Sequence, residues 1–345
     1  MASLLAFDRL GITCKEALLF DGGNPVGAAA NKPYAHEVRE ARAGALAFAS
    51  SPLHVMVAGK SLVNPVRDSV CHLCSTGLPS GSFVRVSDGL LLRSPELCFL
   101  QMAALIPFHA LVKLGFELCG LYTLQPDGRA EYQRVLPPTT VSALSAYLER
   151  RPRAPGVATA RKALRYVAVA SGSSMETAMA VILCLPLRLG GYGLPLPRMN
   201  YRIDAPKSKG HGWEKSYYLC DLYWPDAHIG VEYDSDLEHT GPIRIAEDAR
   251  RRNDLASRGI TTITATREQV MDGEGFDRIA RQLAKRLNVR IRSERGWSLD
   301  ARQRLFRSLV TMKDVEASWT KGDADKNPTQ ARAVWRSACT QGKTS

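Results

Sequence analysis

The sequence lacks a run of about 18 apolar residues, the length expected of a helix that spans a membrane. Its longest apolar candidates, 178–187 and 97–112, are short or are interrupted by Pro186, Pro107 and His109. The N-terminus also lacks a basic segment followed by a long apolar stretch, which a secretory signal would have. We therefore expect a cytoplasmic protein with no membrane partner.

A disulfide framework is also missing. The eight cysteines are scattered along the chain, mostly among apolar residues, and this distribution suits a reducing compartment. Cys71 and Cys74 form one CxxC pair, but no second pair of ligands follows at zinc spacing. Buried free thiols account for the cysteines, and a zinc-stapled structural protein using Cys71 and Cys74 stays open as an alternative.

Acidic residues are fewer than basic ones. The 345 residues include 46 Lys and Arg against 34 Asp and Glu, which gives a net charge of +12 and a pI near 9.4. A chain with this excess of positive charge favours polyanionic partners, because Lys and Arg gain affinity by releasing counterions from phosphates. The charge balance therefore indicates nucleic acid as the leading partner.

The chain separates into three zones, and no internal repeat is present. Residues 1–155 predict an N-terminal mixed α+β domain, with strands at 53–57 and 82–86 and a helix that follows the cap Ser94 and Pro95. Nothing in this zone specifies a chemistry. Residues 156–292 predict an α/β domain, and residues 293–345 a basic, Trp-containing, partly disordered tail with one helix near 299–310.

The middle zone alternates in a definite order, α-β-β-β-α-β-α. Helical and strand patterns follow one another, with glycine and proline punctuation between them. The predicted elements are a helix at 173–185, strands at 199–204, 217–224 and 228–234, a polar helix at 243–258 that ends at Gly259, a strand at 260–266 and an amphipathic helix at 276–287.

Three carboxylates interrupt the two central strands of this zone, in the stretch CDLYWPDAHIGVEYD (220–234). A hairpin that turns at 226–227 places Asp221 opposite Glu232, where Cβ atoms are about 4.5–5.5 Å apart. Alternation along the strand puts Asp234 on the face of Glu232. Like charges so close repel, and a bound Mg²⁺ or Mn²⁺ removes that penalty. The alternative is that these acids lie on a solvated hairpin.

The same residues resemble a known family. Asp221, then Glu232-x-Asp234, His239 and D-x-x-R-x-x-x-L-x-x-x-G from Asp248 to Gly259 look like the PD-(D/E)XK nuclease superfamily, in its Vsr-like (very-short-patch-repair-like) branch. The helix carrying Glu176 resembles the first helix of that group. The superfamily's usual lysine is replaced by Asp234, as in this branch. The resemblance covers about residues 170–290 and implies a restriction-endonuclease-like core.

The resemblance implies a role for each site residue. Asp221 and Glu232 would bind Mg²⁺ or Mn²⁺, and Asp234 and His239 would assist the attacking water or the leaving group. Asp248 would support the phosphate-binding residues, which we expect to be Arg251, Arg252, Lys207 and Lys209. Glu176 would bind the metal from the first helix, directly or through water, although Ser173-x-x-Glu176 also fits a capping box.

Each of the other residues has a plainer alternative. His239 can be an exposed loop histidine, and Asp248 with Arg251 a surface ion pair three residues apart on a helix. Arg252 can belong to a solvated basic face, and the segment with Lys207 and Lys209 can be an ordinary turn. The prediction is a Mg²⁺-dependent endonuclease, and the resemblance favours DNA as its substrate, in phage defence or DNA repair. Its rival is a catalytically inactive nucleic-acid-binding regulator or antitoxin with a nuclease-like fold.

Overall fold

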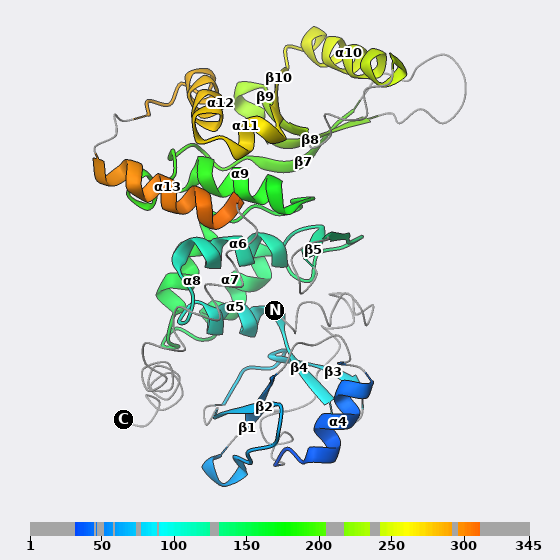
Figure 1. Cartoon of the computed structure of the whole chain (residues 1–345), viewed down its shortest axis with the longest axis vertical. Helices are drawn as coiled ribbons and strands as arrows, with labels where there is room; N and C mark the ends of the chain where they lie inside the picture. The colour runs from blue at the N-terminus through cyan, green and yellow to red at the C-terminus, as the bar shows by residue number, and fades with distance from the viewer. Residues whose placement is uncertain are drawn as a thin grey trace. The chain divides into compact units, whose positions relative to one another are not determined.

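The computed structural model describes residues 32–44, 46, 52–57, 59–73, 77–87, 90–124, 131–204, 217–234, 242–291 and 296–310. These residues form two units that divide between Arg165 and Tyr166 (Figure 1). We call them the N-terminal unit and the C-terminal unit. In the described residues, no helix is long and apolar enough to cross a membrane.

The N-terminal unit mixes helices with small sheets. Its strands form three separate pairs: β1 (Leu53–Val57) runs parallel to β2 (Ser69–Leu73), while β3 (Phe83–Ser87) with β4 (Leu90–Arg93) and β5 (Tyr122–Leu124) with β6 (Glu131–Gln133) are antiparallel. Its helices are α4 (Ala35–Ala43), α5 (Pro95–Met102), α6 (Phe108–Leu118), α7 (Val141–Glu149) and α8 (Val157–Leu164), with a 3₁₀ turn at Lys60–Leu62.

Helices α5 to α8 pack together around fully buried Phe99, Leu111 and Phe116. Helix α5 begins as the sequence predicts, because the Ser94 hydroxyl accepts a hydrogen bond from the Leu97 N–H and Pro95 fills the first turn. The mixed composition of this unit confirms the coarse prediction of an α+β region. Helix α8 belongs to this unit, so the division lies about one helix later than residue 155.

The C-terminal unit is built on a four-stranded sheet with the order β10-β9-β8-β7. The strands are β7 (Arg198–Asp204), β8 (Tyr217–Trp224), β9 (Ile229–Asp234) and β10 (Thr261–Thr266). The pairs β7–β8 and β8–β9 are antiparallel, and β10 runs parallel to β9. The parallel pair needs a crossover, which helix α10 (Pro242–Ser257) supplies.

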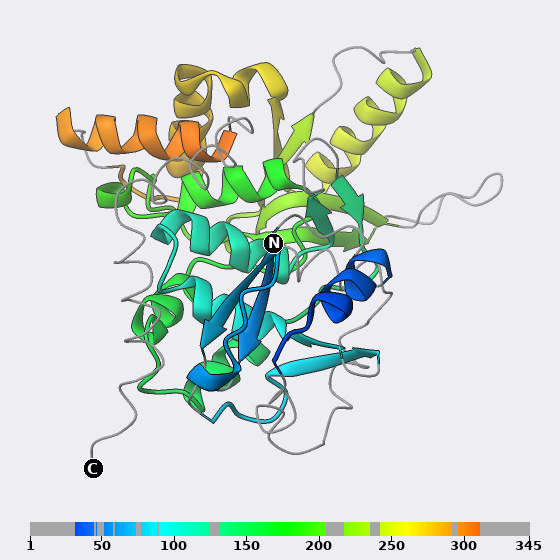
Figure 2. The same ribbon diagram turned by 60° about the horizontal axis from the view of Figure 1, so that its bottom comes forward.

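The remaining helices of this unit are α9 (Ser174–Cys184), α11 (Arg267–Met271), α12 (Gly273–Arg286) and α13 (Gly296–Val310), with 3₁₀ turns at Leu187–Leu189 and Pro225–Ala227. Helices α9 and α10 lie on opposite sides of the sheet (Figures 1 and 2). The elements follow the predicted order α-β-β-β-α-β-α from α9 to α12, with short α11 as an addition. The α/β class is therefore confirmed.

Helix α13 packs on α9, although its residues were expected in a tail. Arg302 explains the attachment: its guanidinium lies 3.7 Å from the centre of the Tyr192 ring and donates to the carbonyls of Gly190 and Gly191. At Gly191 a Cβ would meet the Leu185 carbonyl at 2.0 Å, so only glycine fits this turn. The predicted disordered segment after 310 lies outside the described residues.

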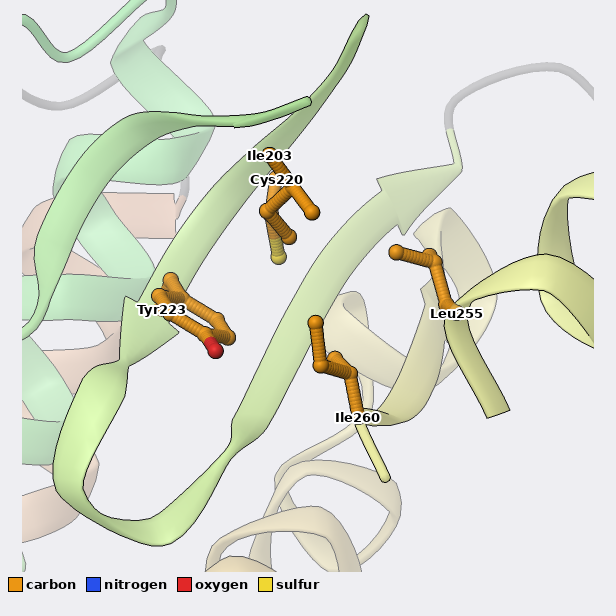
Figure 3. Close-up of a cluster of buried hydrophobic side chains, with 5 residues drawn as sticks. All are labelled: Ile203, Cys220, Tyr223, Leu255 and Ile260. Atoms are coloured by element: carbon orange, nitrogen blue, oxygen red, sulfur yellow. The ribbon is translucent and has the colours of Figure 1, made fainter. Parts of the chain in front are cut away.

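Helix α10 is fixed to the sheet by one apolar cluster, Ile203, Cys220, Tyr223, Leu255 and Ile260 (Figure 3). Leu255 of α10 is 1% exposed and contributes to this cluster. Arg251 lies one helical turn before Leu255 and therefore on the same side of α10. Burial of Leu255 thus directs Arg251 toward strands β8 and β9.

Candidate functional site

The hairpin of β8 and β9 has the predicted register. Leu222 pairs with Val231, Tyr223 with Gly230 and Trp224 with Ile229. The turn between the strands is the 3₁₀ turn Pro225–Ala227 followed by a left-handed residue, His228, with φ 48°. In this register Asp221 and Glu232 are the next positions beyond the last backbone pair.

Beyond that pair, side chains replace the backbone ladder between β8 and β9. The Asp221 Oδ2 accepts a hydrogen bond from the Tyr233 N–H at 2.7 Å. Arg251 Nη2 donates to the Leu219 carbonyl of β8 and to Glu232 Oε1 of β9, the latter at 2.6 Å. Backbone pairing of β8 with β9 therefore ends where the carboxylates begin. Beyond that point, the hydrogen bonds of Asp221 and Arg251 connect the two strands.

Glu176 reaches this region from the first turn of α9. The Ser173 hydroxyl accepts a hydrogen bond from the Glu176 N–H at 3.1 Å and caps the helix. The Glu176 Oε2 accepts hydrogen bonds from the Gly172 N–H at 2.8 Å and from the Asn200 side-chain amide at 2.7 Å. Only the Ser173 half of the expected capping box is present, because the Glu176 carboxylate binds Gly172 and Asn200 instead.

Asn200 comes from β7 and lies opposite Asp221, between the pairs Met199–Leu222 and Tyr201–Cys220. Its φ of 44° is left-handed, a conformation that Asn adopts more readily than most residues. Its amide nitrogen also donates to the Ala170 carbonyl at 3.0 Å. Glu176, Asp221 and Asn200 thus meet on one part of the sheet.

The surroundings of Glu176 and Asp221 disfavour a negative charge on both carboxylates at once. Burial, followed by the negative charge of Asp221, raises the pKa of Glu176 to about 7. Burial also raises the pKa of Asp221, although the Tyr233 N–H and the Arg251 charge act in the opposite direction. A cation between the two acids would remove both effects.

Glu232 has its own counterion. The ion pair with Arg251 is partly buried, with side chains 23% and 30% exposed. The Arg251 guanidinium also lies 5.6 Å from the centre of the Tyr218 ring, and the Tyr218 hydroxyl donates to Asp254 on α10 at 2.7 Å. This set of contacts joins α10 to both strands next to the acids.

The structure therefore places the predicted site residues unequally. Glu176 and Asp221 come together, whereas Glu232 lies one position beyond the last β8–β9 pair and is bound by Arg251. Asp234 ends β9 and is exposed, and Arg252 is exposed on α10. His239, Lys207 and Lys209 lie outside the described residues, as does the side chain of Asp248.

Sequence reasoning missed Asn200 and Gly172. An Asn in the middle of a strand is a usable signal, because Asn is depleted in strands. Gly172 gives a weaker signal, since it merely precedes a helix cap. Glycine is needed at position 172 because a Cβ there would lie 2.9 Å from the Asn200 amide nitrogen and 3.2 Å from Glu176 Oε1.

The donor set can be tested against a divalent metal. It consists of carboxylate oxygens, the ligands that Mg²⁺ and Mn²⁺ prefer, and it carries repelling charge that a cation would neutralise. Among the residues that the structure describes, no three His, Cys, Asp or Glu side chains are grouped closely enough to hold a metal ion. Glu176 and Asp221 thus fit a cation as a pair, and Glu232 would join them only by leaving Arg251.

The second cysteine of the CxxC pair lies outside the described residues. Cys71 is a free thiol that donates to the Asn64 carbonyl at 3.3 Å. The zinc alternative therefore stays a prediction.

Comparison with known proteins gives two relatives in Mycobacterium tuberculosis. The chain is 30% identical over 144 residues to "Uncharacterized protein Rv2248" of strain H37Rv and to "Uncharacterized protein MT2308" of strain CDC 1551. The match covers 42% of this chain and 47% of each relative, so the chain spans about half the length of the curated relatives it matches. No protein-family model matches the chain, and no solved structure matches it either.

Proposed function

We propose that the C-terminal unit is a metal-dependent nuclease domain with a restriction-endonuclease-like core, which hydrolyses phosphodiester bonds. The observation that carries the proposal is the approach of buried Glu176 to half-buried Asp221, where the pairing of β8 and β9 ends. The α-β-β-β-α-β-α order and the motif resemblance support it. The positive net charge fits a nucleic-acid substrate, and the resemblance favours DNA, in phage defence or DNA repair.

Asp221 and Glu176 would hold Mg²⁺ or Mn²⁺, with Glu232 as a further ligand. When bound, the ion supplies positive charge that stabilises the negative charge developing on the phosphoryl group. Asp234 and His239 would exchange protons with the attacking water or the leaving group. Arg252, Lys207 and Lys209 would contact backbone phosphates, and Asp248 would orient the basic residues of α10.

Arg251 has a double role in this proposal. Its guanidinium binds the Glu232 carboxylate at 2.6 Å, and guanidinium binds phosphate with the same planar geometry. A substrate phosphate can therefore take Arg251 from Glu232. Glu232 would then be released beside Asp221 at the moment when substrate is present.

The test is cleavage by the purified full chain. Plasmid DNA, single-stranded DNA and RNA are each incubated with and without Mn²⁺, for the wild type, D221N and the control D226N. Asp226 is an exposed acid in the turn of the same hairpin. We expect D221N to lose cleavage by more than about 100-fold, because even groups that only support metal ligands are worth about 10–100-fold.

D226N should cleave like the wild type. Cleavage by D221N at the wild-type rate would refute the assignment of Asp221. Preference among the three substrates would identify the nucleic acid that the domain cuts.

The ion pair of Glu232 with Arg251 favours a second candidate, a regulator or antitoxin that binds nucleic acid without cutting it. In such a protein Arg251 would neutralise Glu232 permanently. Calorimetry separates the two: the regulator would bind DNA but take up no Mn²⁺. The nuclease would take up Mn²⁺ in a manner that depends on Asp221.

A further inference from the structure

The Glu176 carboxylate is held asymmetrically. Both amide donors that reach it, the Gly172 N–H and the Asn200 side chain, bind the same oxygen, Oε2. Among the described residues, no amide donates to Oε1. Glu176 is nevertheless buried and close enough to Asp221 to be affected by its charge. The two amide donors therefore fix Oε2, and Oε1 is the oxygen that neither of them binds.

The orientation of the Asn200 amide follows from its neighbours. Its nitrogen lies 2.7 Å from Glu176 Oε2 and 3.0 Å from the Ala170 carbonyl oxygen. Both neighbours are acceptors, so the NH₂ group must face them, and its two N–H bonds are both used. The amide is thus held by the Ala170 carbonyl, on the chain before α9, and in turn holds the Glu176 carboxylate.

The backbone around this contact is shaped to allow it. Asn200 has a left-handed φ of 44°, and Ala170 one of 66°. A Cβ on Gly172 would approach the Asn200 nitrogen to 2.9 Å, which is too close without a shift. These contacts are not needed to cap α9, since the Ser173 hydroxyl already caps the helix. Two left-handed residues and one glycine therefore lie at the contact between Asn200 and Glu176.

From these contacts we propose that Asn200 is a positioning residue, which holds Glu176 through Oε2 so that Oε1 and the Asp221 carboxylate share one divalent cation. The inference rests on the proposed function. Asn200 donates neutral hydrogen bonds, which favour the charged carboxylate without taking the place of the ion. Residues that orient metal ligands in this way typically change metal affinity by about 10–100-fold when they are replaced.

The test is the affinity of the full chain for Mn²⁺, measured by calorimetry on N200G. Glycine accepts the left-handed backbone, so the substitution removes the amide alone. N288G is the matched control, because Asn288 also has a left-handed φ, 54°, but follows α12 rather than the site. We expect N200G to bind Mn²⁺ about 10–100-fold more weakly, and N288G to bind like the wild type.

A second variant, G172A, tests the same contact in case N200G does not fold. G172A leaves the backbone of Asn200 intact but pushes its amide away from Glu176. We expect weakened Mn²⁺ binding, with hydrogen exchange of β8 and β9 as in the wild type. For both variants, the Mn²⁺ concentration at half-maximal cleavage should rise more than the rate at saturating Mn²⁺ falls.

The outcomes separate the two proposals. Wild-type Mn²⁺ affinity in folded N200G or in folded G172A would overturn the role of Asn200, even if D221N abolishes binding. Wild-type affinity in D221N would overturn the metal site itself. If N200G and G172A lower the saturated rate but leave the half-maximal Mn²⁺ concentration unchanged, Asn200 does not act through the cation.

Discussion

The two units contain ionisable pairs of opposite character. In the N-terminal unit the His54 and His72 rings stack at 4.9 Å, with Nδ1 of His54 2.6 Å from Nε2 of His72. Burial lowers the pKa of both, that of His72 to about 4. In the C-terminal unit burial and repulsion raise the pKa of Glu176 to about 7.

The difference follows from the hydrogen-bonding capacity of the groups. A neutral imidazole has one donor and one acceptor nitrogen, so one ring can donate a hydrogen bond to the other without any further proton. Two carboxylates only accept, so their pair needs a proton or a cation. Two neutral histidine rings can therefore pair with each other directly, whereas the Glu176–Asp221 pair needs a proton or a cation to relieve its repulsion. Acid should move the stabilities of the two units in opposite directions.

The largest expected effect concerns Glu176. The folded chain keeps its proton up to about pH 7, while the unfolded chain releases it near 4.5. The folded state therefore binds more protons between these values. The free energy of unfolding should fall as pH rises through this window, by on the order of 3 kcal/mol. E176Q should remove this slope in metal-free protein, measured by hydrogen exchange of β8 and β9 across pH.

E268Q serves as the control, because Glu268 is exposed at the start of α11. It should keep the wild-type slope. A slope that survives in E176Q would show that Glu176 is not the group responsible.

Arg251 gives an intermediate effect. R251A removes the guanidinium that binds the Glu232 carboxylate at 2.6 Å. For this partly buried pair the cost should be about 1–2 kcal/mol, between the values for exposed and for buried ion pairs. R252A, at an exposed position, should change stability by less than about 0.5 kcal/mol. Chemical denaturation of metal-free protein compares them, and equal losses would contradict the ion pair's role.

The smallest effect concerns His72. The unfolded chain takes up a proton below pH 6.5, but folded His72 resists it until about pH 4. Stability of the N-terminal unit should therefore fall as pH drops from 6.5 toward 4, with partial exposure of the rings reducing the size. H72Q should flatten this loss and H36Q, at an exposed site, should not. Amide exchange in β1 and β2 is the measurement, and an unchanged loss in H72Q would exclude the histidine pair.

Local sequence signals predicted the framework of the C-terminal unit. Pro225 and the alternation on either side set the hairpin register, and Gly259, with φ 73°, follows the end of α10 as expected. The sequence therefore predicted the register that carries Asp221 and Glu232, but not that backbone pairing ends one position before them. The mixed character of residues 1–155 was also predicted, with β1 at the expected 53–57.

Contacts between residues far apart in the chain could not be predicted from the sequence. Asn200 and Glu176 are 24 residues apart and meet because a left-handed backbone turns the amide toward α9. Arg251 of α10 meets Glu232 of β9 because burial of Leu255 directs this side of the helix toward the sheet. Both contacts depend on tertiary packing, which residue patterns along one element do not encode.

The central claim is that Glu176 and Asp221 form one cation site. Calorimetric titration of Mn²⁺ into metal-free full-length chain, wild type against the double variant D221N/E176Q, tests it most directly. We expect saturable uptake of Mn²⁺ by the wild type and none by the double variant. Equal uptake by both proteins, or no uptake by the wild type, would contradict it.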